Sequence, residues 1–503
     1  MIQNIIVPPP PPCSMPGVVF LADKSGTGVQ ELFAADLFGT TLSNLSGPLV
    51  AGGNVVDYAW SPDRTWVAFV ADKEVDETYE LYMVLPAGGA PVKVNAPLPG
   101  PADVKTGIVW SPDSTRLAYI LDHHTGNATE LHTVGAGGVG GDLEVSEPHP
   151  GGWIVIDFAW APDGSRLAYR AGDLAGAFIA ELYTTLPADS AGSVKVSGPM
   201  IATGDVANYH WSPDSTHLAY RADQETDGLF EIYVSAATGS AQNVKVSAGD
   251  TNIQFGWSPD SSLIAFRANG ELFVTLPSGA SQIVKLNVPV SGNGVSGFFW
   301  SPDGSRIAYR AQPVGSTGGR LYTSLPDGTG GSIEVSGTMV ASGGVGNLAW
   351  SPDGTRIALV SDREIDGRFA LYTTSPTDGS ACVRVSGFFG HVLPGSHHFD
   401  WSPDSARLVY ASDQETPDVL ELFTSFPTGT AGNVKVSGPQ AGGGAITQFG
   451  WAGNGTRAIY SARQQSATCA ELFTSPSDTA VGNVAVSGAF PPASAGVTTY
   501  IAR

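Results

Sequence analysis

The sequence has few charged side chains, fewer basic than acidic ones, and no long apolar run. Charged residues make up 14% of its 503 positions, and 25 basic residues against 47 acidic ones give a formal net charge of −22. An acidic surface repels phosphate backbones and anionic lipid headgroups, which argues against nucleic-acid and membrane-surface partners. Because no stretch approaches the roughly 18 apolar residues of a membrane helix, we expect no membrane insertion.

Cysteine is scarce as well. Three residues cannot build a disulfide framework for a chain of this length, and none belongs to a CxxC pair. They are Cys13, Cys382 and Cys469. The apolar start at 5–7 is too short for a signal-peptide core. The proline run at 8–12 predicts a stiff polyproline spacer, so we assign residues 1–16 to a Pro-rich N-terminal segment.

Glycine and proline are abundant, with 63 and 36 residues, and short alternating runs outnumber apolar stripes of helical period. This profile favours β structure with many turns. A chain of this length exceeds a typical single core, so we expect several domains or one architecture that grows by repetition.

A tryptophan followed by a tight-turn signature, mostly Trp-Ser-Pro-Asp, recurs at intervals of 43 to 51 residues. Self-similarity at this period is typical of propeller blades, since each blade is a small sheet that needs neighbours to cover its faces. The tryptophans are Trp60, Trp110, Trp160, Trp211, Trp257, Trp300, Trp350, Trp401 and Trp451.

One repeat divides into four predicted strands, at 206–211, 217–221, 231–234 and 243–247. Between the first two, proline presets the backbone of a turn and aspartate can bond its own backbone. The residue two before each tryptophan is apolar or aromatic, and period-two spacing places both on one strand face. We therefore predict that these pairs form the core between blades.

The two ends of the chain complete one further unit. Segments 17–22, 31–33 and 40–45 match the last three strands of a repeat, and 497–502 matches 55–60, the first strand of a repeat. The final strand would therefore close the first blade. This pairing predicts one all-β, ten-bladed propeller of four-stranded blades, although the number exceeds the usual range. Two five-bladed rings are the alternative.

We assign residues 17–503 to this propeller. The first blade is shared between 17–50 and 495–503, and the other blades start near the nine tryptophans.

Two repeats read Trp-Ser-Pro-Asp-Gly, at 300–304 and 350–354, and Arg-Ile-Ala follows one residue later in both. With these motifs the chain resembles the PD40 (WSPDG) repeat family of TolB-like propellers, a WD40-like repeat, over residues 17–503. The same repeat occurs in partner-binding propellers, in propeller domains of prolyl-oligopeptidase-like hydrolases and in some polysaccharide lyases, so it leaves function open. Relatives with these repeats are usually exported, which implies an extracellular, cell-surface or periplasmic location.

The loop at 223–231, between the second and third strands of its repeat, is the most acidic. Carboxylates stand at positions 1, 3, 5 and 9 with glycine at 6, a spacing that resembles the calcium loops of FG-GAP propellers. Ca²⁺ takes about six to eight oxygens, and glycine permits the bend that brings close carboxylates together. We therefore predict Ca²⁺ here and at 72–80. The ligands would be Asp223, Glu225, Asp227, Glu231, Asp72, Glu74, Asp76 and Glu80.

The alternative interpretation is a solvated hairpin tip, whose acidic side chains keep the sheet edge soluble. Cross-strand ion pairs such as Arg221 with Glu231 favour it, because a paired glutamate is a poorer ligand. The other such pairs are Arg170 with Glu181 and Arg267 with Glu271. The pattern also decays in other repeats, where Ala370 takes the ninth position and Pro417 the fifth.

A polar side chain stands three residues before the tryptophan in most repeats. The first strand of a propeller blade lies innermost, so we expect these side chains at the mouth of the central channel, where they can hydrogen-bond a ligand. Solvation of a wide pore is the alternative. The residues are Asp57, Asp157, Asn208, Gln254, Asn347, His398 and Gln448.

These features predict a non-catalytic propeller that binds a protein or a glycan. One alternative is an extracellular assembly unit, in which copies of the chain associate with each other through blade edges or calcium-bound hairpins. A second is a polysaccharide lyase or hydrolase in the channel, with His398 or His210 as the base. The sequence contains no Gly-x-Ser-x-Gly nucleophile elbow and no HExxH motif, and adjacent histidines at 123–124 and 397–398 cannot chelate one metal from within a strand.

Overall fold

The computed structural model describes residues 17–98, 100, 102–122, 128–147, 153–173, 179–189, 191–239, 243–247, 249–250, 253–279, 283–389, 399–430, 432–441, 446–453, 455–466, 469–479, 481–490 and 496–502. The Pro-rich segment 1–16 with Cys13, the histidines at 123–124 and 397–398, and the predicted boundary at 495 and 503 lie outside these residues.

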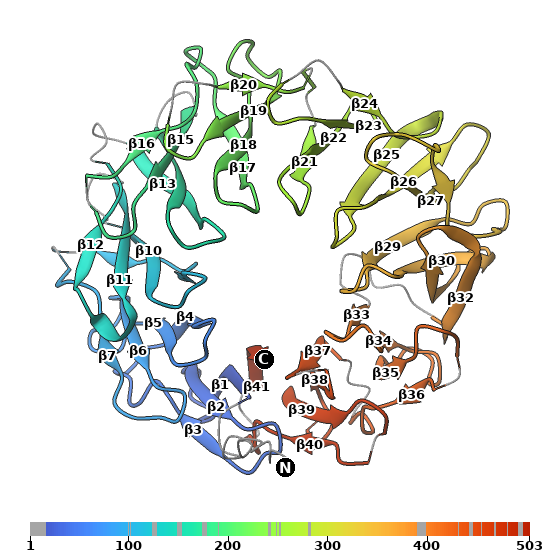
Figure 1. Ribbon diagram of the computed structural model, residues 1–503. Coiled ribbons are helices and arrows are strands. Elements are labelled where there is room, and N and C mark those ends of the chain that lie inside the picture. Colours follow the sequence, from blue (N-terminus) through green and yellow to red (C-terminus); the bar gives the residue numbers. More distant parts are fainter. Residues whose placement is uncertain are drawn as a thin grey trace, which may run out of the picture.

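The described residues form ten antiparallel sheets arranged as blades of one ring, with a single 3₁₀ turn, η1 (Ala136–Gly138) (Figure 1). We name the four strands of a blade A to D from the middle of the ring outward. The A strands are β41 (Gly496–Ala502), β4 (Val55–Trp60), β8 and β9 (Asp103–Val104 and Val109–Trp110), β13 (Trp153–Trp160), β17 (Val206–Trp211), β21 (Gln254–Trp257), β25 (Val290–Trp300), β29 (Val345–Trp350), β33 (Phe399–Trp401) and β37 (Gln448–Ala452), for blades 1 to 10 in that order.

The other three positions follow the same blade order. The B strands are β1 (Val18–Asp23), β5 (Val67–Ala71), β10 (Arg116–Asp122), β14 (Leu167–Asp173), β18 (His217–Ala222), β22 (Ile264–Ala268), β26 (Ile307–Pro313), β30 (Ile357–Ile365), β34 (Leu408–Ser412) and β38 (Arg457–Ala462). The C strands are β2 (Glu31–Ala35), β6 (Glu80–Val84), β11 (Thr129–Gly135), β15 (Ile179–Thr185), β19 (Glu231–Ala236), β23 (Glu271–Thr275), β27 (Arg320–Ser324), β31 (Arg368–Ser375), β35 (Glu421–Ser425) and β39 (Glu471–Pro476). The D strands are β3 (Leu42–Asn44), β7 (Val92–Lys93), β12 (Asp142–Glu144), β16 (Val194–Lys195), β20 (Val244–Lys245), β24 (Val284–Lys285), β28 (Ile333–Glu334), β32 (Asp378–Phe388), β36 (Val434–Lys435) and β40 (Val484–Ala485).

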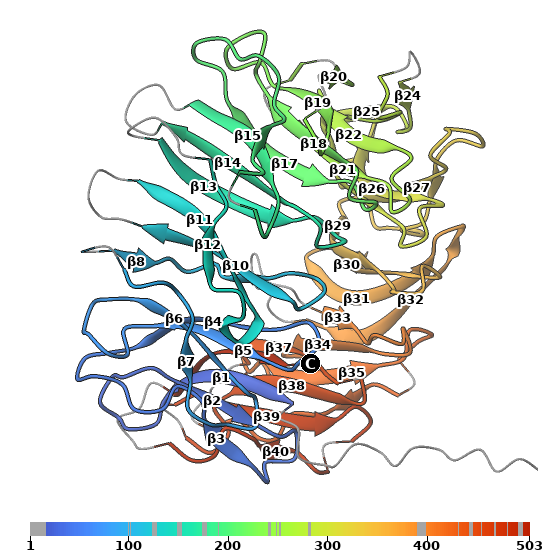
Figure 2. The same cartoon turned by 60° about the vertical axis from the view of Figure 1, so that its left-hand side comes forward.

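The two ends of the chain meet in blade 1. Strand β41 pairs antiparallel with β1, so that Val19 lies opposite Ile501 and Phe20 opposite Tyr500. Figure 1 shows these two strands side by side, and Figures 1 and 2 show the blades following one another around a single ring. The predicted ten-bladed propeller is therefore confirmed, and the alternative of two five-bladed rings is wrong.

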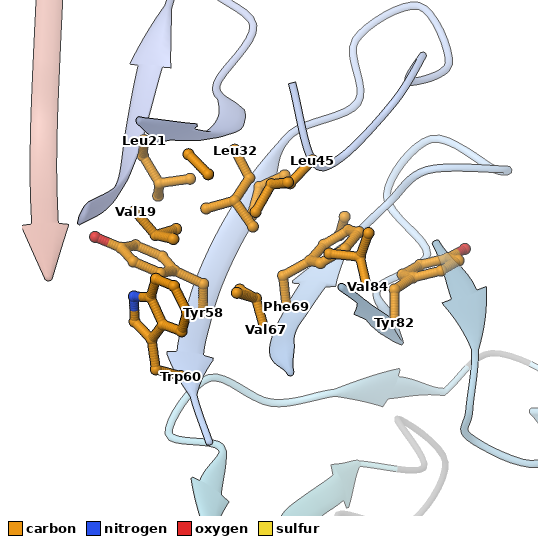
Figure 3. Packing of buried hydrophobic residues seen from close by; sticks show 13 residues of the cluster. Val19, Leu21, Leu32, Leu45, Tyr58, Trp60, Val67, Phe69, Tyr82 and Val84 are labelled. Atoms are coloured by element: carbon orange, nitrogen blue, oxygen red, sulfur yellow. The ribbon is translucent and has the colours of Figure 1, made fainter. Parts of the chain in front are cut away.

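The hydrophobic core lies between blades, as the alternation predicted. Figure 3 shows Tyr58 and Trp60 of β4 packing on Val19 and Leu21 of β1. These four side chains are at most 8% exposed. Burying a large apolar side chain contributes about 1.5–3 kcal/mol, so each interface between blades is a small core of its own.

Where the motif is Trp-Ser-Pro-Asp, in blades 2, 3 and 5 to 9, the turn joins strands A and B through the same hydrogen bond from serine to aspartate. In blade 5 the Ser212 hydroxyl donates to Asp214 at 2.6 Å and accepts from the His217 amide at 2.9 Å. Ser301 and Asp303 repeat the first bond at 2.6 Å in blade 7. The motif is thus a hydrogen-bonded β-turn, which is the role that its proline and aspartate predicted.

Each tryptophan also connects its blade to the one before. Its indole N–H donates to the carbonyl of the residue that precedes the tryptophan of the previous blade, at 3.0–3.4 Å. The donors are Trp110, Trp160, Trp211, Trp257, Trp300, Trp350, Trp401 and Trp451. Among the described residues Trp60 Nε1 has no such partner, because its neighbour is the chain-closing strand β41.

Candidate functional site

The polar residues predicted to line the middle of the ring do lie on the A strands. Asn208, Gln254, Asn347 and Gln448 are exposed on β17, β21, β29 and β37, whereas Asp57 and Asp157 are half-buried on β4 and β13. His398 lies outside the described residues. Figure 1 shows these strands bordering the middle of the ring. The structure therefore distributes these side chains around the ring instead of bringing them into one cluster.

Two of these residues hold neighbouring elements together. Asp57 accepts hydrogen bonds from the amides of Gly107 and Ile108 in blade 3, at 2.6 and 3.1 Å. Asp157 forms an ion pair with Arg170 of β14 at 2.5 Å. A carboxylate that already has partners is less available to a ligand, so these two residues contribute mainly to the ring itself.

Arg170 continues the contact into the next blade. Its guanidinium donates to the carbonyls of Val206 and Ala207 on β17, at 2.8 and 2.7 Å. The predicted pair of Arg170 with Glu181 is therefore wrong, because the arginine faces strand A and not strand C.

Asn208, Gln254 and Gln448 differ from the two aspartates. Within the described part of the chain, none of their side chains forms a hydrogen bond, and all three are exposed. In blades 3 and 7 the A strands instead expose an apolar side chain just before the tryptophan, since Val109 and Phe299 are 41% and 48% exposed. The A strands of different blades thus offer exposed amides or apolar side chains, and both kinds of group suit recognition of a partner.

The acidic loop at 223–231 is organised by its first aspartate. Asp223 is 3% exposed and accepts hydrogen bonds from the amides of Gly228, at 2.8 Å, and Asp205, at 2.7 Å. Asp72 does the same for the amides of Glu77 and Asn54 in blade 2. This aspartate therefore fixes its own hairpin against the start of strand A.

The glutamates at positions 3 and 9 meet a lysine of strand D. Lys245 lies 3.0 Å from Glu225 and 2.5 Å from Glu231. In blade 2 Lys93 lies 2.8 Å from Glu74 and 3.1 Å from Glu80. The predicted pairing of Arg221 with Glu231 is wrong in register, because Arg221 lies opposite Ile232.

Arg267 and Glu271 do not match the third predicted ion pair either. Arg267 lies opposite Leu272, and its guanidinium donates to the carbonyl of Val295 at 3.1 Å. Glu271 instead pairs with Lys285 of strand D at 2.5 Å.

Asp76 and Asp227, at position 5, are exposed at the hairpin tips. The residues described by the structure contain no group of three or more His, Cys, Asp or Glu side chains placed to hold a metal ion. Since backbone amides and lysines occupy the other carboxylates, the contacts favour the solvated-hairpin interpretation. The calcium site stays a prediction.

Blade 3 carries a charged cluster that the sequence reasoning missed. His132 of β11 takes the position that Tyr233 has in blade 5, and its ring nitrogens lie 3.1 Å from Asp142 and 3.3 Å from Glu130. Burial opposes protonation of the ring, but the hydrogen bonds to the two carboxylates outweigh it and raise the pKa of His132 to about 9. The sequence does carry a signal for this cluster, because His132 stands at a strand C position where other blades have tyrosine or phenylalanine.

No helix in the described part of the chain is long and apolar enough to span a membrane.

The sequence matches no family model and no curated protein. Among solved structures, one of a eukaryotic initiation factor is 11% identical with a TM-score of 0.48, and the match covers 83% of this chain and 94% of that one. An oligogalacturonate lyase in complex with manganese is 14% identical (TM-score 0.37; 82% and 98% covered), and the C-terminal WD40 domain of Sif2 is 13% identical (TM-score 0.36; 75% and 97% covered). These similarities carry no argument about function, and the fold assignment rests on the strand pairing above.

Proposed function

We propose that the protein is a non-catalytic binding propeller that uses the inner strands of its ring to hold a protein or a glycan. The observation that carries the proposal is the set of exposed amides of Asn208, Gln254 and Gln448, which have no hydrogen-bond partner among the described residues. The backbone that carries these side chains already lies in paired strands, so a partner has only the side chains to order, which favours affinity.

The chemistry of these groups suits either class of partner. A carboxamide donates and accepts hydrogen bonds, so it can pair with sugar hydroxyls as well as with peptide groups. Phe299 and Val109, exposed on the A strands of blades 7 and 3, can cover the apolar face of a sugar ring or of a side chain.

The test compares the wild-type protein with a triple variant, Asn208→Ala, Gln254→Ala and Gln448→Ala, on an oligosaccharide array and a peptide array. We expect a ligand of one class to bind the wild type and to bind the variant at least tenfold more weakly. The control is Thr226→Ala with Thr430→Ala, two exposed threonines on outer loops. Equal binding by the triple variant, or turnover of a bound polysaccharide, would overturn the proposal.

Membership in the TolB-like WSPDG group, with the exported location it implies, is part of the same proposal. Its support is the recurrence of the Trp-Ser-Pro-Asp turn and its hydrogen-bonding pattern around the ring.

A further inference from the structure

A crevice of about 730 Å³ lies between blades 9 and 10, on the C and D strands and so away from the inner strands. Its polar walls include Glu421 and Lys435 of blade 9 and Asn483 of blade 10, with Gln440 on the link between the two blades. Phe473 forms part of its apolar wall.

Three oxygen atoms in this crevice lack a hydrogen-bond donor. Among the described residues, Glu421 Oε2, Gln440 Oε1 and Asn483 Oδ1 are buried and accept no hydrogen bond. Glu421 is only 4% exposed. Buried acceptors in folded proteins are nearly always paired, so three unpaired ones lining one crevice indicate a missing donor group.

Glu421 lacks a donor because blade 9 has phenylalanine at a strand C position where several blades have tyrosine. In blade 5 the equivalent Glu231 binds Lys245 through one oxygen and accepts from the Tyr233 hydroxyl, at 2.7 Å, through the other. Blade 9 has Phe423 at the tyrosine position, opposite Lys435. Lys435 binds Glu421 Oε1, and the second oxygen is left without a partner.

The open space of the crevice arises from a second difference between blade 10 and other blades. Strand D carries a lysine at one register position in five blades, opposite the central residue of strand C. Blade 10 has Ala485 there, opposite Phe473. The lysines are Lys93, Lys195, Lys245, Lys285 and Lys435. The lysine side chain that fills this position in those five blades is missing at the crevice.

We propose that this crevice binds the side chain of an arginine presented by a partner protein. A guanidinium has five N–H donors and no acceptor, which matches three unpaired oxygens better than a sugar hydroxyl does. Its methylene chain can lie along Phe473, as long cationic side chains do on apolar surfaces. Glu415 and Glu421 both face Lys435, so two carboxylates meet one ammonium and an additional cation is favourable.

The site is separate from the inner strands and goes beyond the function proposed above. Either proposal can fail while the other holds, because the variants that test them share no residue.

The test uses the full chain and three peptides, acetyl-Gly-Arg-Gly-amide and its counterparts with lysine or citrulline, measured by isothermal titration calorimetry. We expect the arginine peptide to bind at least tenfold more tightly than the citrulline peptide. Glu421→Gln should weaken arginine binding at least tenfold. Ala485→Lys should abolish it, because the new lysine side chain would occupy the crevice beside Phe473 and add a positive charge there.

Glu231→Gln is the matched control, since it makes the same change at the same repeat position in blade 5, and it should leave arginine binding unchanged. Phe423→Tyr gives Glu421 the hydroxyl donor that Tyr233 gives to Glu231 in blade 5, and it should weaken binding without loss of stability. Equal binding of the citrulline peptide, undiminished binding by Ala485→Lys, or an oligosaccharide that binds here in place of the arginine peptide would overturn the proposal.

Discussion

At the residue scale, the ring depends on single side chains that hydrogen-bond across blade boundaries. The indole of Trp257 donates to the His210 carbonyl at 3.2 Å, and seven other tryptophans do the same. A buried polar group left without a partner costs about 1–3 kcal/mol. The tryptophans therefore contribute both apolar area and a hydrogen bond, except at Trp60.

Because Trp257 has this hydrogen bond and Trp60 does not, we expect replacement by phenylalanine to destabilise the protein more at position 257 than at position 60. Trp257→Phe removes packing and leaves the His210 carbonyl without its indole donor, whereas Trp60→Phe removes packing alone. We expect Trp257→Phe to lower the free energy of unfolding by about 1 kcal/mol more than Trp60→Phe. Urea denaturation of the two variants measures this difference in the free energy of unfolding. Equal losses would show that the hydrogen bond of the Trp257 indole contributes nothing to stability.

His132 predicts a pH-dependent contribution to stability. Its pKa is raised from 6.5 to about 9, so the stabilisation is fully present below pH 6.5 and is lost as the pH rises through about 9. We expect up to about 3 kcal/mol to be lost over that interval. His132→Phe, which restores the aromatic type found in other blades, should remove this loss when melting is followed from pH 6 to about 9.5. A variant with the same pH profile as the wild type would contradict the assignment.

At the scale of elements, blades 2, 5 and 9 use a lysine of the outer strand to hold the acidic hairpin. Lys245 on β20 binds Glu225 of the hairpin and Glu231 of β19 at once. Exposed ion pairs contribute little each, about 0.2–1 kcal/mol, so this arrangement acts mainly on the geometry of the loop.

The hairpin contacts predict the outcome of metal removal. We expect the wild-type melting temperature to be the same in calcium and in chelator, because lysines and backbone amides already occupy the carboxylates. Lys245→Met removes the cation that Glu225 and Glu231 share and should create a calcium-dependent rise in the melting temperature. A rise already present in the wild type would instead establish the calcium site that the loop spacing predicted.

At the scale of the whole molecule, one strand decides whether the ring closes. Strand β41 completes blade 1, and Tyr500 reaches back to the Ile459 carbonyl of blade 10 at 3.3 Å. Without it, β1 would still pair with β2, but its inner edge would be unpaired.

Deletion of residues 496–503 should therefore open the ring. We expect a lower melting temperature, a larger radius of gyration in small-angle scattering, and dimers at high concentration through the exposed edge of β1. The alanine variant of Thr498, an exposed residue of the same strand, is the control. Unchanged compactness after the deletion would mean that the blade interfaces alone hold the ring closed.

The amino-acid sequence by itself determined the architecture. The period of the tryptophans gives the blade count, and the match of 497–502 to 55–60 gives the closure, because both are local patterns that need no knowledge of distant contacts. The strand predicted at 206–211 is β17, while the one predicted at 243–247 is shorter, Val244–Lys245.

Only the tertiary structure decided which polar groups are already paired. Asp57 and Asp157 matched the other predicted lining residues in sequence, yet they bind neighbouring elements, whereas Asn208 remains exposed. The lysines of strand D, not the arginines of strand B, hold the glutamates, and the crevice at Glu421 appears where the repeat loses two side chains at once. These outcomes depend on register across strands and blades, which the spacing along one chain does not specify.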